Sequence, residues 1–109
     1  MAELPAQPFR VVYSGLVQGK LSEWAGLARP AGLAPSLQEA LVTIDRCLHS
    51  DPLAWGEASK KLRDANLIVC CGFHARILVR YGVDEQRRIV YVVECELLPG
   101  HPLKPTAGS

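Results

Sequence analysis

Residues 67–98 carry two long apolar runs, and they constrain the fold of this chain more than any other stretch. Four polar residues at positions 84–87 separate the two runs. A short polar break between runs rich in β-branched residues is typical of a β-hairpin with a four-residue loop. The sequence therefore predicts two antiparallel strands, one on each side of this break.

Each predicted strand has an apolar row on one face, because neighbouring strand residues point to opposite sides. The predicted core rows are Ala75, Ile77, Val79, Tyr81 and Val83, and Ile89, Tyr91, Val93, Cys95 and Leu97. The opposite rows are His74, Arg76, Leu78, Arg80 and Gly82, and Arg88, Val90, Val92, Glu94 and Glu96. This second face is basic on one strand and acidic on the other, which favours it as the place for a functional site. A plain solvated face is the alternative, since antiparallel sheets commonly expose one side to water.

Length and composition fit one globular domain. The chain has 109 residues, of which 49% are hydrophobic and 21% charged, and this excludes an intrinsically disordered chain. We expect the domain to span residues 9–98, between a loose N-terminus at 1–8 and a Pro/Gly-rich tail at 99–109. No apolar run reaches the roughly 18 residues of a membrane span, and the first residues lack the pattern of a signal peptide. A cytoplasmic protein is expected.

Upstream of the hairpin, a short alternating stretch at residues 9–14 predicts a strand, and helical periodicity follows. Two apolar stripes predict helices over about 15–29 and 36–49; they are Val17, Leu21, Trp24 and Ala28, and then Leu37, Leu41, Ile44 and Leu48. Ser36 and Glu39 have the spacing of a capping box at the start of the second helix. The two helices should form an antiparallel hairpin on one face of the sheet.

The segment between the second helix and the β-hairpin has no clear periodicity. We expect a loop or single turn over residues 53–65, with Trp55 as a core plug over the helix ends. A strand at 67–71 and a turn at 72–74 should follow. The predicted fold class is therefore α+β, with a helical hairpin packed on one face of an antiparallel-dominated sheet.

The four cysteines favour free thiols in a reducing compartment. Cys70 and Cys71 are adjacent, while Cys47 and Cys95 lie in apolar patterns, so a disulfide framework is not indicated. A zinc site would have to use Cys70, Cys71 and His74. Neighbouring strand residues point apart and no C-x-x-C is present, so we expect neither a metal nor a cofactor.

Charge is unevenly distributed along a chain whose formal net charge is +1. Residues 60–91 hold seven Lys or Arg against three Asp or Glu, which gives this stretch a charge of +4. A cationic half on a near-neutral protein suits an anionic partner, either a nucleic acid or an acidic protein segment.

Three short motifs resemble the RelE/ParE toxin superfamily. The first is the strand FRVVYS at residues 9–14. The second is the spacing of Leu48, Asp51-Pro52, Gly56 and Leu62, which is similar to that family's linker after the helical hairpin. The third is RILVRYGVDE at residues 76–85, followed by the apolar strand RIVYVVEC at 88–95. The resemblance covers residues 9–98 and implies a β-α-α-β-β-β order.

The resemblance also implies site residues. The family's ribosome-dependent ribonucleases hold the scissile phosphate with sheet cations and with an Arg and a Tyr near the C-terminus. By resemblance Arg76 is the catalytic candidate, and Arg80 and His74 are candidates to substitute for the absent groups. The cationic stretch described above supplies the candidate nucleic-acid or partner-binding residues, which are Lys60, Lys61, Arg63 and Arg88. Leu67 and Val69 stand where the family has lysines, and the C-terminal Arg/Tyr element is absent. Whether this chain is an enzyme therefore stays open.

Three functions remain open at this point. The first is a toxin of a type II toxin–antitoxin pair, bound by an antitoxin protein and acting on translation (mRNA or the ribosome) or on DNA gyrase. The second is a RelE/ParE-fold binding module that has lost the nuclease residues. The third is an unrelated small α+β domain, which would share only the order of its elements with that family.

Overall fold

The computed structural model describes residues 8–62 and 66–104. In chain order, its elements are β1 (Arg10–Tyr13), α1 (Gly15–Ala28), α2 (Ala34–Ser50), α3 (Pro52–Trp55), β2 (Glu57–Leu62), β3 (Leu67–His74), β4 (Ile77–Asp84) and β5 (Ile89–Leu97). The fold class is α+β, as predicted.

One five-stranded sheet has the order β1-β5-β4-β3-β2. β1 runs parallel to β5, and the other neighbours are antiparallel, so the sheet is dominated by antiparallel pairing. Residues 53–65 were predicted as a loop or single turn. The four-residue α3 is such a turn, but the strand β2 that follows it was not predicted. The sequence of β2, EASKKL, has no apolar alternation. It is an edge strand, and its backbone pairing with β3 holds it in the sheet.

Both long helices were predicted within two residues of their observed ends. Ser14 caps α1 by accepting a hydrogen bond from the backbone N–H of Val17. The predicted capping box was wrong, since α2 begins at Ala34 without a side-chain cap. Pro35 lies in the first turn of α2, where its fixed φ favours helix initiation. The helix therefore starts ahead of Ser36.

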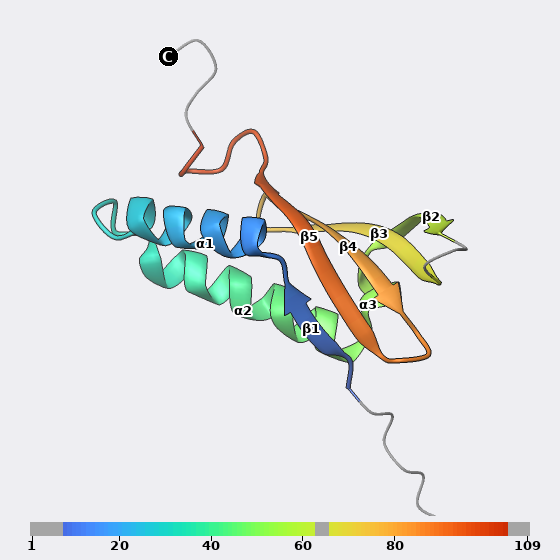
Figure 1. The fold of residues 1–109 in the computed structure, drawn as a ribbon. Helices are drawn as coiled ribbons and strands as arrows, with labels where there is room; N and C mark the ends of the chain where they lie inside the picture. The colour runs from blue at the N-terminus through green and yellow to red at the C-terminus, as the bar shows by residue number, and fades with distance from the viewer. Residues whose placement is uncertain (1–7, 63–65, 105–109) are drawn as a thin grey trace, which may run out of the picture.

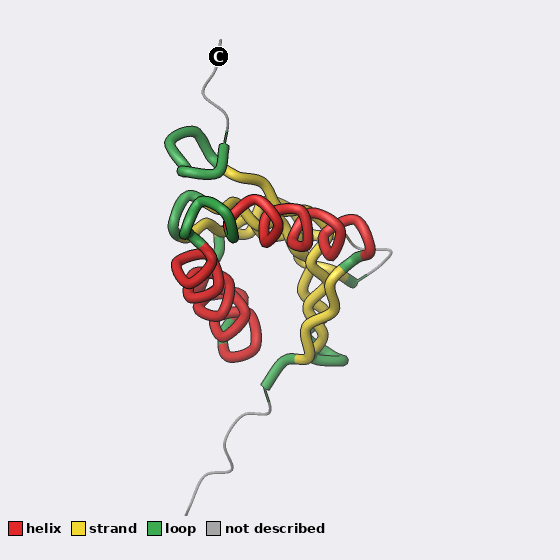
Figure 2. The backbone as a smooth tube through the Cα atoms, turned by 90° about the vertical axis from the view of Figure 1, so that its left-hand side faces the viewer, coloured by secondary structure: helices red, strands yellow, loops and turns green. Residues whose placement is uncertain are grey.

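The core lies between the helical hairpin and one face of the sheet. Val17 and Leu21 of α1 and Leu41 and Ile44 of α2 surround the same small space as residues of the sheet, namely Tyr13, Ile77, Val79, Val92 and Cys95. Both predicted helical stripes thus face the core. α1 and α2 lie next to each other, with β1 at the margin of the sheet (Figure 1). In Figure 2 α2 and the strands form separate layers, and α1 crosses between them at the top.

A β-bulge in β5 reverses which side of the sheet some of its residues were predicted to face. Arg80 pairs with Glu94, but Tyr81 pairs with Val92, so Val93 is the extra residue. Val93 is 48% exposed, whereas Val90 and Val92 are buried. The predictions that Ile89, Tyr91 and Val93 face the core were therefore wrong, and so were the predictions that Val90 and Val92 face away from it. The prediction for Cys95, beyond the bulge, was right.

The turn between β3 and β4 is two residues later than expected. β3 continues through Gly72 to His74, and the turn consists of Ala75 and Arg76 at φ angles of 51° and 61°. Both residues were predicted to be in a strand, and that prediction was wrong. Gly72 does not form the turn. It lets the ring of Trp55 pack closely on the backbone of β3, because a Cβ at position 72 would lie 2.6 Å from that ring.

Trp55 is partly buried against the core and stacks on Tyr81 with ring centroids 5.8 Å apart, which confirms the predicted plug. At the C-terminal end, Leu103 packs against the core, and its neighbour His101 lies with it beside the start of α2. The expected loose segments at 1–7 and 105–109 lie outside the described residues, whereas Leu103 of the expected tail packs against the core. Among the described helices, none has the length and hydrophobicity to cross a bilayer.

Candidate functional site

The sheet has a second face, opposite the core, which we call the outer face. Strand alternation and pairing bring together solvent-facing side chains from β1, β3, β4 and β5. The apolar, aromatic and thiol side chains among them are Val12, Val69, Cys71, Phe73, Leu78, Tyr91 and Val93, and the charged ones are Arg10, Arg80, Glu94 and Glu96, with Glu57 of β2 beside Cys71. Within the described part of the chain, both long helices pack on the other side. This face is a candidate for an interaction surface.

Arg80 and Glu94 form an ion pair in the middle of the outer face. The Arg80 Nη1 and Glu94 Oε2 atoms are 2.8 Å apart, and the two residues are direct neighbours in the β4–β5 ladder. Their side chains remain 49% and 40% exposed, so water screens the pair and its contribution to stability is small. The pair neutralises the guanidinium charge that was expected to contact a phosphate.

Apolar side chains surround this ion pair. Phe73 is 70% exposed and Val12 is 39% exposed, at opposite sides of the face. Val93 is turned outward by the bulge described above. Val12 lies next to Tyr91 in the β1–β5 ladder, close to Val93, and Phe73 lies next to Leu78 in the β3–β4 ladder. Isolated exposed apolar residues are normal in soluble proteins, but such groups favour a surface that binds something.

Arg76 lies at the end of the sheet and not on the outer face. Its Nη1 donates a hydrogen bond to the carbonyl oxygen of Pro99 at 3.1 Å, and a Cβ on Gly100 would come within 3.1 Å of the guanidinium. The backbone N–H of Leu98 donates to the Arg76 carbonyl. Arg76 therefore anchors the C-terminal segment, and it is not the sheet-face neighbour of Arg80 that alternation predicted.

The other predicted site residues are dispersed. His74 is exposed at the end of β3, beside the turn. Lys60 and Lys61 lie in the edge strand β2, opposite Val69 and Ile68 of β3. Arg63 lies outside the described residues. The remaining residue, Arg88, is in the β4–β5 turn at a φ of 54°, with its guanidinium carbon 4.1 Å from the centre of the Phe9 ring.

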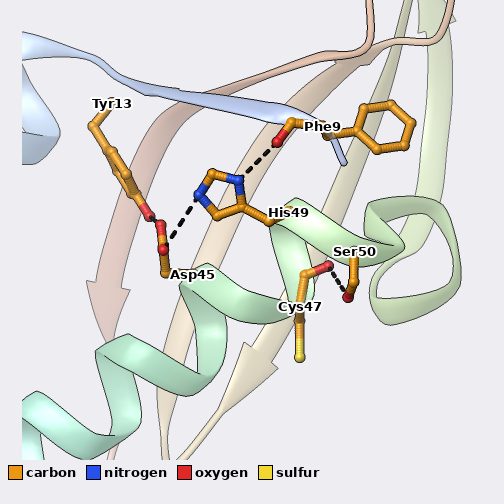
Figure 3. A network of polar contacts seen from close by, with 6 residues as sticks. All are labelled: Phe9, Tyr13, Asp45, Cys47, His49 and Ser50. Carbon is orange, nitrogen blue, oxygen red and sulfur yellow. Dashed lines mark hydrogen bonds and ion pairs between the residues drawn. The ribbon is translucent and has the colours of Figure 1, made fainter. Parts of the chain in front are cut away.

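A polar network that the sequence did not predict joins β1 to α2 (Figure 3). The Tyr13 hydroxyl donates to Asp45, and the second Asp45 oxygen is 3.3 Å from Nε2 of His49. The His49 Nδ1 atom lies 2.7 Å from the carbonyl oxygen of Phe9, and the backbone N–H of Phe9 donates to the His49 carbonyl. The i,i+4 spacing of Asp45 and His49 was visible in the sequence, but their partners on β1 were not.

This network is a clamp rather than a reactive centre. Burial, together with the Asp45 carboxylate, raises the pKa of Tyr13, so the phenol keeps its proton and acts as a donor. Both ring nitrogens of His49 already have partners. Tyr13 and Asp45 also border an apolar groove of about 490 Å³ between α1 and α2, which reaches Arg29 at its other end.

The thiols and acids show no metal-binding arrangement. Among residues 8–62 and 66–104, no three His, Cys, Asp or Glu side chains come close enough to bind one ion. Burial raises the pKa of Cys70 and of Cys95, which keeps both as neutral thiols in the core. All four cysteines are free.

Comparisons with known proteins found no matching family model, no matching curated protein and no matching solved structure.

Proposed function

We propose that this protein is a binding module that resembles the RelE/ParE toxins and acts through contact with a protein partner on its outer face, without cleaving RNA. The observation that carries the proposal is the arrangement of the expected catalytic cations. Arg80 is paired with Glu94, while Arg76 is bonded to the backbone of Pro99. Electrostatic catalysis at a phosphate needs cations directed at one common point. These two cations are committed to different parts of the chain.

The order of elements supports the resemblance at the level of fold. A strand, a helical hairpin and an antiparallel series of strands follow one another, and the first strand lies beside the last. β2 is an additional strand relative to the β-α-α-β-β-β order that the resemblance implies. The proposed setting is the cytoplasm, and the partner that the resemblance implies is an antitoxin-like protein.

The chemistry of the outer face suits a protein better than a nucleic acid. Phe73, Val93 and Val12 expose apolar surface around an ion pair that is internally neutralised. Protein interfaces have such apolar centres with charged residues at the rim, and the charged Arg10, Glu57 and Glu96 of this face lie in the two edge strands and near the end of β5. A nucleic-acid surface instead needs cations that can replace the counterions of the phosphates.

Co-purification with the product of the neighbouring reading frame tests the proposed surface. Phe73→Asp places a charge on the outer face, and Val42→Asp places one on an equally apolar site of α2 that is 46% exposed. We expect the first variant to lower the amount of bound partner at least about tenfold, equivalent to about 1.4 kcal/mol, and the second to leave it unchanged. Equal binding by both variants, or loss in both, would contradict the assigned surface.

One observation favours a second candidate, a ribonuclease toxin that acts on translation. Arg76 lies in the stretch RILVRYGVDE that resembles the family's strand and turn, although its left-handed φ of 61° belongs to the two-residue hairpin turn that it forms with Ala75. Growth arrest on expression that is lost in Arg76→Ala would favour this candidate. Arrest that survives Arg76→Ala but is lost in Phe73→Asp would favour a toxin that acts by binding, on DNA gyrase or another target.

A further inference from the structure

One flank of α1 carries a stripe of four residues outside the core. Leu16, Lys20, Glu23 and Leu27 are spaced i, i+4, i+7 and i+11, so they lie in a row along the helix. We call this row the α1 stripe. Leu16 is 68% exposed and Leu27 is 49% exposed, although both are large apolar residues. The core contacts of α1 come from a different row, which contains Val17, Trp24 and Ala28.

The composition of α1 gives this exposed flank a defined order of apolar and charged residues. A surface helix normally has a charged or polar side opposite its buried side. Lys20 and Glu23 are the two charged residues of α1, and both belong to the stripe between the two exposed leucines. An apolar residue at each end and one charge pair in the middle make a surface with defined chemistry.

The stripe is complementary to the same stripe of a second copy that runs in the opposite direction. In an antiparallel pair of α1 helices, a two-fold axis between positions 21 and 22 places Leu16 opposite Leu27 of the second copy. The same axis places Lys20 opposite Glu23 of the second copy, because the residue numbers of both pairs have the same mean. A two-fold interface requires this reciprocity, with each contact occurring twice.

We propose that the α1 stripe is the interface of a homodimer in which a second copy of this chain packs its α1 antiparallel to the first. Lys20 is already held in place, since its Nζ donates to the backbone carbonyl of Cys95 at 3.1 Å. An ammonium group has three donors, so two remain for a carboxylate of the second copy. Beside the stripe, a Cβ on Gly19 would have no atom within 4 Å, so the glycine leaves room for close approach of the second helix.

Charge reversal tests both the surface and its direction. Lys20→Glu gives a stripe with two acids, and Glu23→Lys gives one with two bases, so each variant alone is expected to be monomeric. A mixture of the two restores both cross-helix pairs and should form a heterodimer. The double variant Lys20→Glu/Glu23→Lys restores both cross-helix pairs but loses the Lys20 contact to Cys95, so it should dimerise more strongly than either single variant. Sedimentation equilibrium over a concentration series measures each case, and circular dichroism verifies folding.

The matched control is Val42→Glu, which changes an exposed apolar residue of α2 outside the stripe. It should leave the dimerisation constant within about twofold, whereas each single charge reversal should weaken dimerisation at least about tenfold. A protein that stays monomeric up to about 1 mM, the weak end of measurable association, would overturn the proposal. Single variants that dimerise as the unchanged protein does, or a mixture without heterodimer, would overturn it too. Glu23→Lys keeps the Lys20 contact to Cys95. The loss of dimerisation in Glu23→Lys alone therefore still tests the interface if Lys20→Glu unfolds.

Discussion

Two adjacent valines in β5 provide a direct test of the bulge. Val92 is 2% exposed and Val93 is 48% exposed. Val92→Ala removes two buried carbons, worth about 0.8 kcal/mol each, and leaves a cavity, so we expect a total loss of about 2 to 3 kcal/mol in the free energy of unfolding. Val93→Ala removes the same atoms from a partly hydrated side chain and should cost less than about 0.5 kcal/mol.

Urea denaturation followed by circular dichroism measures this difference. With a slope of roughly 1.5 kcal/mol per molar urea for a small domain, Val92→Ala should lower the midpoint by about 1.3 to 2 M. The loss of strand propensity affects both variants, so the difference between them reports burial. If Val93→Ala were the more damaging change, β5 would have no bulge and simple alternation would hold.

Three further predictions concern single groups. Tyr81→Phe removes the donor to the buried carbonyl of Pro52 and should cost about 1 to 3 kcal/mol in a urea titration, while Tyr91→Phe on the outer face should cost less than about 0.5 kcal/mol. Burial lowers the pKa of His101 below its ordinary value of about 6.5, and its Nδ1 accepts the backbone N–H of Leu103. His101 therefore binds a proton more readily in the unfolded state, so the docking of residues 98–104 should be complete above about pH 6.5 and weaken as the pH falls. Amide hydrogen exchange of these residues measures the docking, and protection that does not change in acid would contradict the prediction. Iodoacetamide should label the partly exposed Cys47 and Cys71 before the buried Cys70 and Cys95, as peptide mass spectrometry can determine, and equal rates in the folded protein would refute the assigned burial.

The sequence was sufficient to predict the helical hairpin, because each apolar stripe repeats over several turns and has one consistent period. It was insufficient for β5, where residues 89–93 are apolar at every position. Both alternating rows then look like core, so alternation alone cannot locate a bulge. The edge strand β2 was missed for the opposite reason, since its pairing partner and not its own pattern holds it in the sheet.

The site was less predictable than the fold, since its contacts join distant segments. Arg76 was singled out by its motif, but its bond to Pro99 depends on where the chain runs after β5. The two-residue turn at Ala75 and Arg76 also lacks the Asn-Gly signal that usually marks such turns. Asp45 and His49 became recognisable as a clamp only through the neighbouring position of Tyr13.

An assay of mRNA cleavage on programmed ribosomes by the purified protein tests the central claim most directly. The claim is that this protein acts by binding and not by cleavage, because Arg80 and Arg76 are engaged in contacts within the chain. We expect the mRNA to remain intact, with the unchanged protein and Arg76→Ala giving the same result. Cleavage by the unchanged protein that disappears in Arg76→Ala, with the fold of the variant verified by circular dichroism, would contradict the account.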